Sequence, residues 1–419
     1  MIARIEALNY KCLRYVSQGL QRFQILVGPN ASGKSTFLDV PAFLKDLLQS
    51  GVEEAVLARA NSLRELVWKG QFDAFELAVE WEIPETHRKN GYRFCRYEIR
   101  VGVGGQGGIV LHHETLWLKR EEERREGGKL EAKQRELFPV EPEAPKAIVV
   151  EPRKKTPSGW RKVIVRMPEG GNVYFRSETS GWNAPFRIDS RKAAFANLPE
   201  DEERFPIAIW VRKVILSGLH RLVLNSQKMR EPCRPDAPKT FQPDGSNLPM
   251  VVRELRKSEP QRFRRWLAHV QVALPNIEDI TVREREIDRF LYLEAHFREG
   301  MRLPSWMLSD GTLRFLALTL LAYLPTSDAI YLIEEPENGI HPKALELVFQ
   351  SLSSVYEGQV LMATHSPLLL QLAEPKDLLC FALTPKGATD IVRGDQHPKL
   401  KEWRREVSLG ELLAAGVLA

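Results

Sequence analysis

Residues 28–36 read Gly-Pro-Asn-Ala-Ser-Gly-Lys-Ser-Thr, a composition and spacing suited to holding the phosphates of a nucleotide. The apolar run Phe23–Val27 precedes this loop and predicts a buried strand, and a helical pattern follows from Ser35 to Leu48. In such a strand–loop–helix unit, successive backbone N–H groups and the helix N-terminus converge on one anion. Lys34 would reach the β- and γ-phosphates. We expect ATP to be bound by Gly28, Asn30, Ser32, Gly33, Lys34, Ser35 and Thr36.

Two carboxylates, Glu334 and Glu335, directly follow the apolar run Ile330–Ile333. At the carboxyl end of a parallel strand they would lie beside the phosphate loop. Glu334, together with the Ser35 hydroxyl, is then suited to hold Mg²⁺, either directly or through water. Glu335 is suited to orient and deprotonate the attacking water. The reaction that this set predicts is hydrolysis of ATP to ADP and phosphate.

His365 and the segment Ser309-Asp310-Gly311 complete the set. His365 ends a second apolar run and would hydrogen-bond the γ-phosphate or the attacking water, which makes it the second catalytic candidate after Glu335. Ser309, Asp310 and Gly311 open a helical pattern and form another anion site. Because the first nucleotide already has its cradle, we expect this segment to serve the nucleotide of another copy, in a head-to-tail homodimer with two ATP molecules between the subunits.

The elements that must position these residues are predicted by apolar periodicity. Helix 312–324, strand 329–333, helix 342–353, strand 359–364 and helix 366–372 alternate, which is typical of a parallel sheet. Between residues 70 and 200, strictly alternating runs such as 75–81 and 97–101 indicate an antiparallel, half-exposed sheet. A helical pattern runs from 205 to 224, helices follow over 248–270, and 280–297 is again strand-like.

This pattern predicts an α/β fold and divides the chain into four segments. They are an N-terminal half of a nucleotide-binding head, an antiparallel β-rich subdomain with a charged insertion, a helical lobe with connecting strands, and the C-terminal half of the head, over residues 1–70, 71–204, 205–304 and 305–419.

Bulk composition narrows the class of protein. The 419 residues carry 60 Lys and Arg against 55 Asp and Glu, a net charge of +5 that permits contact with nucleic acid without requiring it. The four cysteines are scattered without metal-ligand spacing, which fits a reducing cytoplasm. The most apolar segment, 313–324, is too short to cross a bilayer and contains Arg314, so we expect a cytoplasmic protein without membrane contact.

The motifs together resemble the ABC-type ATPase heads of the SMC/RecF group, in particular the RecF-like predicted ATPases and their OLD-like relatives. Leu308–Arg314 is similar to their signature motif, Glu334–Pro342 to their Walker B motif and D-loop, and Thr364–Pro367 to their switch-histidine motif. Pro243–Pro249 also recurs in that group. The resemblance implies a RecA-like sheet with an antiparallel β-subdomain and a helical signature lobe, ATP and Mg²⁺ as ligands, and a D-loop that contains Glu337 and Asn338. It also implies DNA as a partner, in repair or in defence against foreign DNA.

The sequence departs from the group in several places. Glu334 stands where ABC proteins generally have Asp, and Ala31 replaces a common Gly, so we expect residue 31 to avoid a left-handed φ. Gln71 is a weak candidate for the Q-loop glutamine, and contact with adenine or phosphates and a purely structural role both stay open for Asn9, Tyr10, Lys11 and Arg14. Residues 119–136 form a charge run, and the patches 153–155, 161–162, 262–265 and 283–285 are candidates for phosphate contacts.

Two features of the group have no counterpart in the sequence. The interval between the two half-motifs lacks heptads, so we expect no long coiled-coil arm. The stretch after His365 is too short for a nuclease domain, so Asp377, Asp390 and Asp395 are expected to be surface carboxylates. Two other functions stay open: a regulatory subunit that senses ATP and controls a separately encoded effector protein, and a transporter ATPase. The second would require a glycine at Asp310 and a clear Q-loop.

Overall fold

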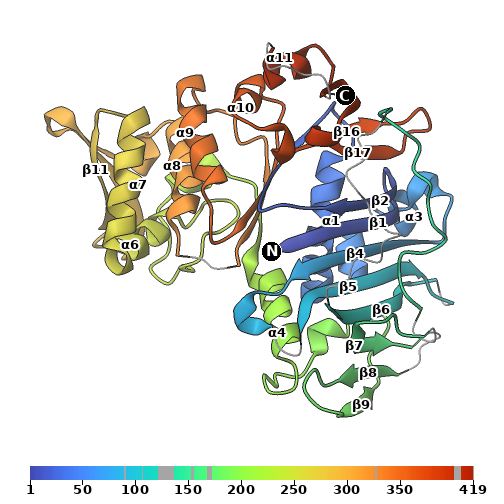
Figure 1. Cartoon of the computed structure of the whole chain (residues 1–419). Coiled ribbons are helices and arrows are strands. Elements are labelled where there is room, and N and C mark those ends of the chain that lie inside the picture. The colour runs from blue at the N-terminus through green and yellow to red at the C-terminus, as the bar shows by residue number, and fades with distance from the viewer. Residues whose placement is uncertain are drawn as a thin grey trace.

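The computed structural model describes residues 1–88, 91–105, 107–120, 136–151, 155–167, 172–325, 328–400 and 407–418. A six-stranded sheet carries the nucleotide motifs, with the strand order β10-β14-β15-β3-β16-β17. Figure 1 labels its last two strands, β16 and β17. Neighbouring strands run parallel except for β17, which pairs with β16 in the antiparallel direction. The strands are Phe23–Val27 (β3), Leu219–Leu222 (β10), Ile330–Glu334 (β14), Gln359–Ala363 (β15), Leu378–Leu383 (β16) and Thr389–Arg393 (β17).

An eight-stranded antiparallel sheet lies beside it, in the order β2-β1-β4-β5-β6-β7-β8-β9. Its first two strands come from residues 1–19, outside the range 70–200 for which the sequence predicts an antiparallel sheet. The four-part division of the chain stays a proposal, and these two strands would join residues 71–204 in it. The strands are Ile2–Tyr10 (β1), Leu13–Gly19 (β2), Ala74–Glu82 (β4), Tyr92–Val103 (β5), Ile109–Arg120 (β6), Trp160–Arg166 (β7), Val173–Arg176 (β8) and Asn183–Phe186 (β9).

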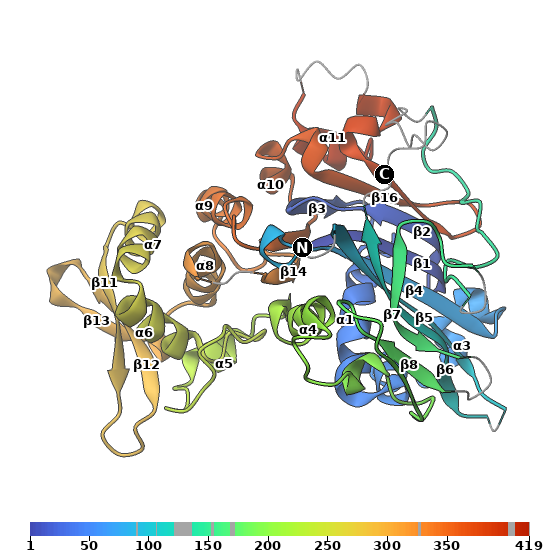
Figure 2. The ribbon, with the colours of Figure 1, turned by 60° about the horizontal axis from the view of Figure 1, so that its bottom comes forward.

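Helix α1 (Lys34–Ser50) lies between the two sheets (Figure 2). Its buried Phe37 and Phe43 share one hydrophobic core with Leu77 of the antiparallel sheet and Leu332 of the six-stranded sheet. Burial on both sides explains why most of the first three turns of α1 are apolar. The helices α2, α3 and α4 belong to the same side of the molecule and span Val52–Leu57, Leu63–Leu66 and Pro206–Lys213.

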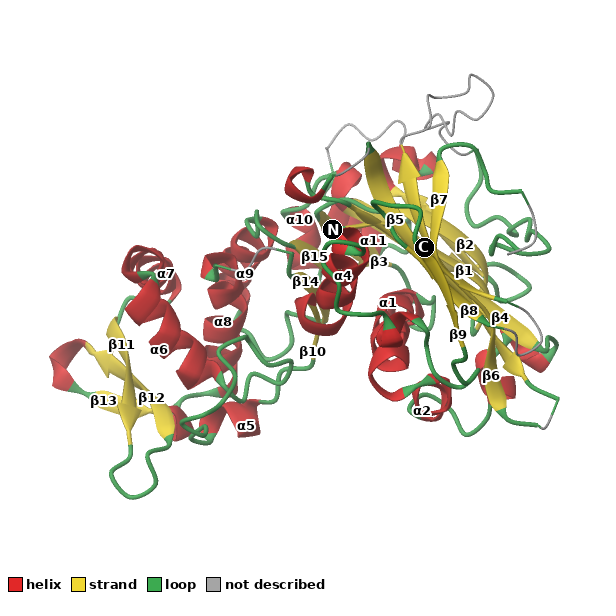
Figure 3. Cartoon of the chain, turned by 90° about the horizontal axis from the view of Figure 1, so that it is seen from below, coloured by secondary structure: helices red, strands yellow, loops and turns green. Residues whose placement is uncertain are grey.

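The opposite face of the six-stranded sheet is covered by a second hydrophobic core. It contains α8 (Asp310–Leu320), α9 (Pro342–Ser353) and α10 (Pro367–Gln371). Beyond them, α6, α7 and a three-stranded sheet form a lobe that projects away from the antiparallel sheet (Figure 3). The remaining elements are Ser226–Arg230 (α5), Leu248–Ser258 (α6), Pro260–Ala273 (α7), Ile277–Glu284 (β11), Leu291–Phe297 (β12), Arg302–Pro304 (β13) and Leu409–Ala414 (α11).

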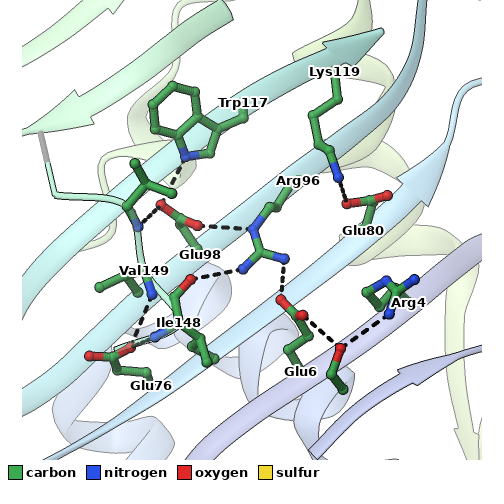
Figure 4. Close-up of polar contacts among 12 residues, drawn as sticks. Arg4, Glu6, Glu76, Glu80, Arg96, Glu98, Trp117, Lys119, Ile148 and Val149 are labelled. Carbon is green, nitrogen blue, oxygen red and sulfur yellow. Dashed lines mark hydrogen bonds and ion pairs between the residues drawn. The ribbon is translucent and has the colours of Figure 1, made fainter. Parts of the chain in front are cut away.

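A buried charge network ties segment 146–150 to the antiparallel sheet (Figure 4). Glu76 accepts hydrogen bonds from the backbone N–H groups of Ile148 (2.6 Å) and Val149 (3.0 Å), and Glu98 accepts one from the indole of Trp117 (2.8 Å). Although burial opposes it, the hydrogen bond from His113 and the charge of Arg96 lower the pKa of Glu98. The buried carboxylates are thus compensated by several donors, as buried charges must be.

The helix expected over 205–224 is a wrong prediction from residue 219 onward. Helix α4 ends at Lys213, a π-helical turn continues to Gly218, and Leu219–Leu222 is the edge strand β10. The strand form wins because β10 pairs in parallel with β14 from Leu219↔Ile330 to Leu222↔Ile333, a ladder that no helix could form. Within the described residues, no helix has the length and hydrophobicity needed to span a membrane.

Candidate active site

The phosphate loop and the acidic strand end meet in one cavity of about 330 Å³. Strand β3 brings in the loop, and β15 lies between β3 and β14, so the carboxyl ends of all three strands share one edge. This placement follows from the parallel order, because ligands bind at the carboxyl edge of such sheets. The residues that line the cavity are Asn30, Ala31, Ser32, Gly33, Lys34, Ser35, Thr36, Glu334, Glu335, Ala363 and His365.

Lys34 occupies the mouth of the loop. Its ammonium group donates hydrogen bonds to the carbonyl oxygens of Gly28 (2.8 Å) and Pro29 (2.7 Å). Burial lowers the pKa of Lys34 to about 8, and the charges of Glu335 and Glu334 oppose that shift. The cavity therefore holds a cation that is desolvated and incompletely neutralised, which favours an anionic ligand.

The backbone of the loop is held from the far end of the chain. Gly33 has φ 103°, and a Cβ placed there would lie 2.3 Å from Oγ1 of Thr389. The Thr389 hydroxyl donates a 2.9 Å hydrogen bond to the carbonyl of Ser32. The expectation for Ala31 is wrong, because its φ is 61°. An alanine pays a conformational penalty in the left-handed region, and such strain collects where a loop closes on a ligand.

The two proposed metal ligands contact each other. The Ser35 hydroxyl hydrogen-bonds one carboxylate oxygen of Glu334, and Arg221 of β10 donates a 2.9 Å hydrogen bond to the other. Hydroxyl and carboxylate oxygens are suitable donors for Mg²⁺, which is usually held by few protein groups together with phosphates and water. The donor set therefore fits Mg²⁺. In the described part of the chain, no group of three or more His, Cys, Asp or Glu side chains could hold a metal ion alone.

Glu335 lies just beyond the strand in a strained conformation, with φ 49°. Its backbone N–H donates to the carbonyl of Ala363 (2.8 Å), and its carboxylate accepts from the side chain of Asn338 (2.5 Å). The carboxylate is exposed in the cavity beside Lys34 and His365. A non-glycine residue at positive φ is uncommon and costs free energy, so the fold over-determines the direction of this side chain.

His365 is half-buried at the end of β15 and is positioned by Glu337. One oxygen of Glu337 accepts hydrogen bonds from the hydroxyl of Thr364 (2.7 Å) and the backbone N–H of His365 (3.0 Å). Burial and the nearby charge of Lys34 lower the pKa of His365, while Glu335 and Glu337 oppose the shift. The imidazole is therefore mostly neutral near pH 7 and can both donate and accept a hydrogen bond.

The signature segment does not line this cavity. Ser309 is the N-cap of α8 and accepts a hydrogen bond from the N–H of Thr312 (3.2 Å), while Asp310 forms a 2.5 Å ion pair with Arg230. Both residues are exposed. Gly311 packs against the D-loop, because a Cβ there would lie 2.3 Å from the carbonyl oxygen of Gly339. A lone chain thus presents the start of α8 to the outside.

Sequence reasoning missed Arg221, Arg230 and Thr389. The alternation of Leu219-His220-Arg221-Leu222 was a signal for a strand end, but the apolar run before it suggested a helix. Arg230 and Thr389 carry no local signal. The expectation of a surface carboxylate is wrong for Asp390, which is buried and accepts a 2.8 Å hydrogen bond from the backbone N–H of Val140.

The tentative nucleotide contacts lie elsewhere. Gln71 is exposed outside the cavity, while Tyr10 and Lys11 hydrogen-bond Asp39 of α1, at 2.6 Å and 3.2 Å. Asn9 accepts a hydrogen bond from Arg14, whose guanidinium lies 4.5 Å from the ring of Phe72. Asn9, Tyr10, Lys11 and Arg14 thus hold the start of the chain against α1 and against Phe72, which precedes β4.

Most described members of the basic patches have partners. Arg262 pairs with Glu357 (2.9 Å), Arg283 with Glu294 (3.0 Å), and Arg285 with Asp288. Lys162 is buried, with its ammonium 5.3 Å from the ring of Trp117. Arg264 and Arg265 are exposed. Residues 153 and 154, and residues 121–135 of the charge run, lie outside the described residues.

A family model described as "AAA domain, putative AbiEii toxin, Type IV TA system" matches residues 23–371. None of the curated proteins matches the chain. Among solved structures, the Smc head bound to the C-winged helix domain of ScpA has 14% sequence identity and a TM-score of 0.52, over 93% of this chain and 96% of that chain. This likeness confirms the expected fold, that of an SMC-type, ABC-type ATPase head.

Two further Smc heads are similar at lower scores. The SMC head domain from Thermotoga maritima has 12% identity and a TM-score of 0.44, over 94% of this chain and 98% of that chain. The Smc head domain with an extended coiled coil, bound to the C-terminal domain of ScpA derived from Pyrococcus furiosus, has 13% identity and a TM-score of 0.47, over 93% and 95%.

Proposed function

The chain belongs to the P-loop family whose model describes an AAA domain of a type IV TA system, and from this premise we propose that it hydrolyses ATP as a head-to-tail homodimer. The observation that carries the proposal is that the phosphate loop and the signature segment lie apart on the same chain. One cavity gathers the phosphate loop, Glu334, Glu335 and His365, while the signature segment faces outward on the same chain. The family supports ATP binding, and the division supports a site that a second copy completes.

Each side chain at the cavity has a role that follows from its contacts. Lys34 would exchange its two backbone carbonyls for phosphate oxygens, which recovers the cost of its burial. Ser35 and Glu334 would hold Mg²⁺, which when bound withdraws charge from the phosphates. Glu335 would accept the proton of the attacking water, and neutral His365 would fix that water or the terminal phosphate by hydrogen bonding.

The partner copy would supply the N-terminus of α8. Ser309, Asp310 and Gly311 present backbone N–H groups and a hydroxyl at a helix start, where partial positive charge favours a phosphate. The ion pair between Arg230 and Asp310 keeps the one acidic side chain of the segment neutralised and turned toward its own lobe. Without that pairing, Asp310 would repel the terminal phosphate of the partner's ATP.

The test is the size of the Glu335→Gln chain with and without ATP and Mg²⁺. The amide keeps the shape of the side chain but cannot take the proton, so we expect ATP to accumulate unhydrolysed and the dimer to persist. Light scattering after size-exclusion chromatography measures the mass, and phosphate release measures turnover. Unchanged turnover would remove Glu335 from the role of base, and a monomer under saturating ATP would refute the shared site.

DNA is the partner that we propose for the closed dimer, in repair or in defence against foreign DNA. A second function is favoured by the ion pairs of Arg283 and Arg285, which neutralise that patch, and by the ion pair of Arg262, which leaves Arg264 and Arg265 as the exposed basic residues of its patch. In that case the ATPase senses nucleotide and controls a separately encoded effector protein. Salt-sensitive binding of plain duplex DNA by the Glu335→Gln dimer supports the first function. Capture of an effector by a dimer without DNA affinity supports the second.

A further inference from the structure

Arg221 reaches the proposed metal site from the neighbouring strand. In the parallel register Arg221 lies opposite Leu332, and Glu334 is two residues further along β14, so the three side chains leave the sheet on one face. The guanidinium contacts one carboxylate oxygen of Glu334 at 2.9 Å, while the hydroxyl of Ser35 contacts the other. Each oxygen of the carboxylate therefore has a protein partner.

The other carboxylate near Arg221 does not depend on it. Asp39 lies 3.7 Å from the guanidinium but already has Arg59 at 2.8 Å, Lys11 at 3.2 Å and the hydroxyl of Tyr10 at 2.6 Å. Among the described residues, Glu334 has no other cation within ion-pair distance. Arg221 is therefore the partner that Glu334 needs, whereas Asp39 has closer partners of its own.

We propose that Arg221 is a built-in counter-cation for Glu334, a positioning residue that sets how strongly ATP binding depends on the metal ion. The inference rests on the proposed function, because Glu334 is a metal ligand only there. Arg221 does not line the nucleotide cavity, so it acts through Glu334 and not on the phosphates. With no metal ion present, its charge keeps the carboxylate from repelling ATP.

Because both side chains of the ion pair are partly exposed, a metal ion could replace Arg221 as the partner of Glu334. The side chains of Arg221 and Glu334 are 43% and 31% exposed, and ion pairs of that kind are weak and screened by water. A divalent ion can therefore displace the guanidinium from Glu334. Were an ion held at Glu334, the guanidinium would repel it, and this repulsion would offset the guanidinium's attraction for the nucleotide.

Removal of Arg221 should change the affinity for ATP in opposite directions without and with a metal ion. Without Arg221, ATP should bind more weakly in EDTA, because the bare carboxylate of Glu334 faces the phosphates. With Mg²⁺, ATP should bind as tightly or more tightly, because the repulsion between guanidinium and metal ion is gone. The ratio of the dissociation constant in EDTA to that in saturating Mg²⁺ should rise about three- to tenfold in Arg221→Gln.

The experiment measures that ratio with a ribose-labelled fluorescent ATP in the full chain carrying Glu335→Gln, so that the nucleotide stays intact. Arg221→Lys keeps the charge and should leave the ratio within about twofold of the parent. Arg283→Gln is the matched control, since Arg283 also pairs with a glutamate at 3.0 Å and is 46% exposed, but on the outer three-stranded sheet. Thermal melting without nucleotide checks that every variant is folded.

The outcomes separate this inference from the proposed function. A raised ratio in Arg221→Gln, with the lysine variant and the control unchanged, supports the role of counter-cation. An unchanged or lowered ratio in Arg221→Gln overturns it while leaving the ATPase intact. If the parent chain binds ATP neither in EDTA nor in Mg²⁺, the proposed function itself fails.

Discussion

Replacing Thr389 with valine tests whether the end of the chain shapes the phosphate loop. Thr389 is fully buried at the start of β17, and its hydroxyl donates a 2.9 Å hydrogen bond to the carbonyl of Ser32. Valine has nearly the same shape but no donor, and its methyl group cannot approach a carbonyl oxygen that closely. The loop must therefore shift at Ser32 and at Gly33, which touches the same side chain.

The expected magnitude follows from that contact. A buried polar group that loses its partner costs about 1–3 kcal/mol, so Thr389→Val should lower the free energy of unfolding by that amount. Because the lost bond lies inside the loop, we expect part of the cost to appear as about a three- to tenfold weaker ATP affinity. Urea denaturation followed by tryptophan fluorescence and titration with fluorescent ATP measure the two effects.

Thr389→Ser is the matched control, because it keeps the hydroxyl and removes only a methyl group, at a cost of about 1 kcal/mol. Serine should retain the parent's ATP affinity. If valine leaves both the unfolding free energy and the ATP affinity at the parent's values, the hydrogen bond has no role in shaping the loop. Equal losses of ATP affinity in both variants would assign the effect to packing instead.

Three other changes address the shared site and the pH dependence of stability. Ser309→Arg should abolish ATP-dependent dimerisation, measured by light scattering, while the monomer still binds ATP. Ser309→Asn is the control, because asparagine preserves the helix cap. A Ser309→Arg dimer that still forms with ATP would contradict the role of Ser309 at the partner's nucleotide. Gly311→Ala places a methyl group 2.3 Å from the carbonyl oxygen of Gly339, so phosphate release should slow and the melting temperature should fall. If both stay at the parent's values, Gly311 and Gly339 do not lie as close together as described. Burial lowers the pKa of His397 from 6.5 to about 4. Between pH 7 and pH 5 the unfolded chain therefore binds more protons than the folded chain. The free energy of unfolding should fall by up to about 2 kcal/mol over that range. In urea denaturation His397→Asn should show a smaller fall, and an equal fall would remove His397 as its source.

The sequence identified the elements whose signals are local. Strand β3 begins and ends at the expected residues, and so does α9, because an apolar run flanked by glycine, or by proline at the first helical turn, fixes such an element within a few residues. The motifs also placed the phosphate loop and the acidic strand end at one edge of the parallel sheet, where β15 separates β3 from β14. Their roles in catalysis stay predictions, since no measurement on this chain tests them.

The failures share a physical cause, which is that the deciding partner lies far away in the sequence. Residues 219–222 become a strand only because β14, more than a hundred residues later, offers a free edge. Thr389 reaches the phosphate loop across most of the chain, and Arg221 reaches Glu334 across 113 residues. Ala31 differs, because a preference for right-handed φ was overruled by the closure of the loop itself.

The D-loop explains why closure and hydrolysis would be linked in one head. Asn338 holds the carboxylate of Glu335 at 2.5 Å, and Glu337 holds the backbone of His365 at 3.0 Å. The next residue, Gly339, is in contact with Gly311 at the start of α8, with no room for a side chain between them. In the proposed dimer, a shift of α8 on meeting a partner's nucleotide would therefore press on the same short loop that positions Glu335 and His365. Since packed contacts transmit such shifts with little compression, the geometry of the proposed base would depend on the partner as well as on the bound ATP.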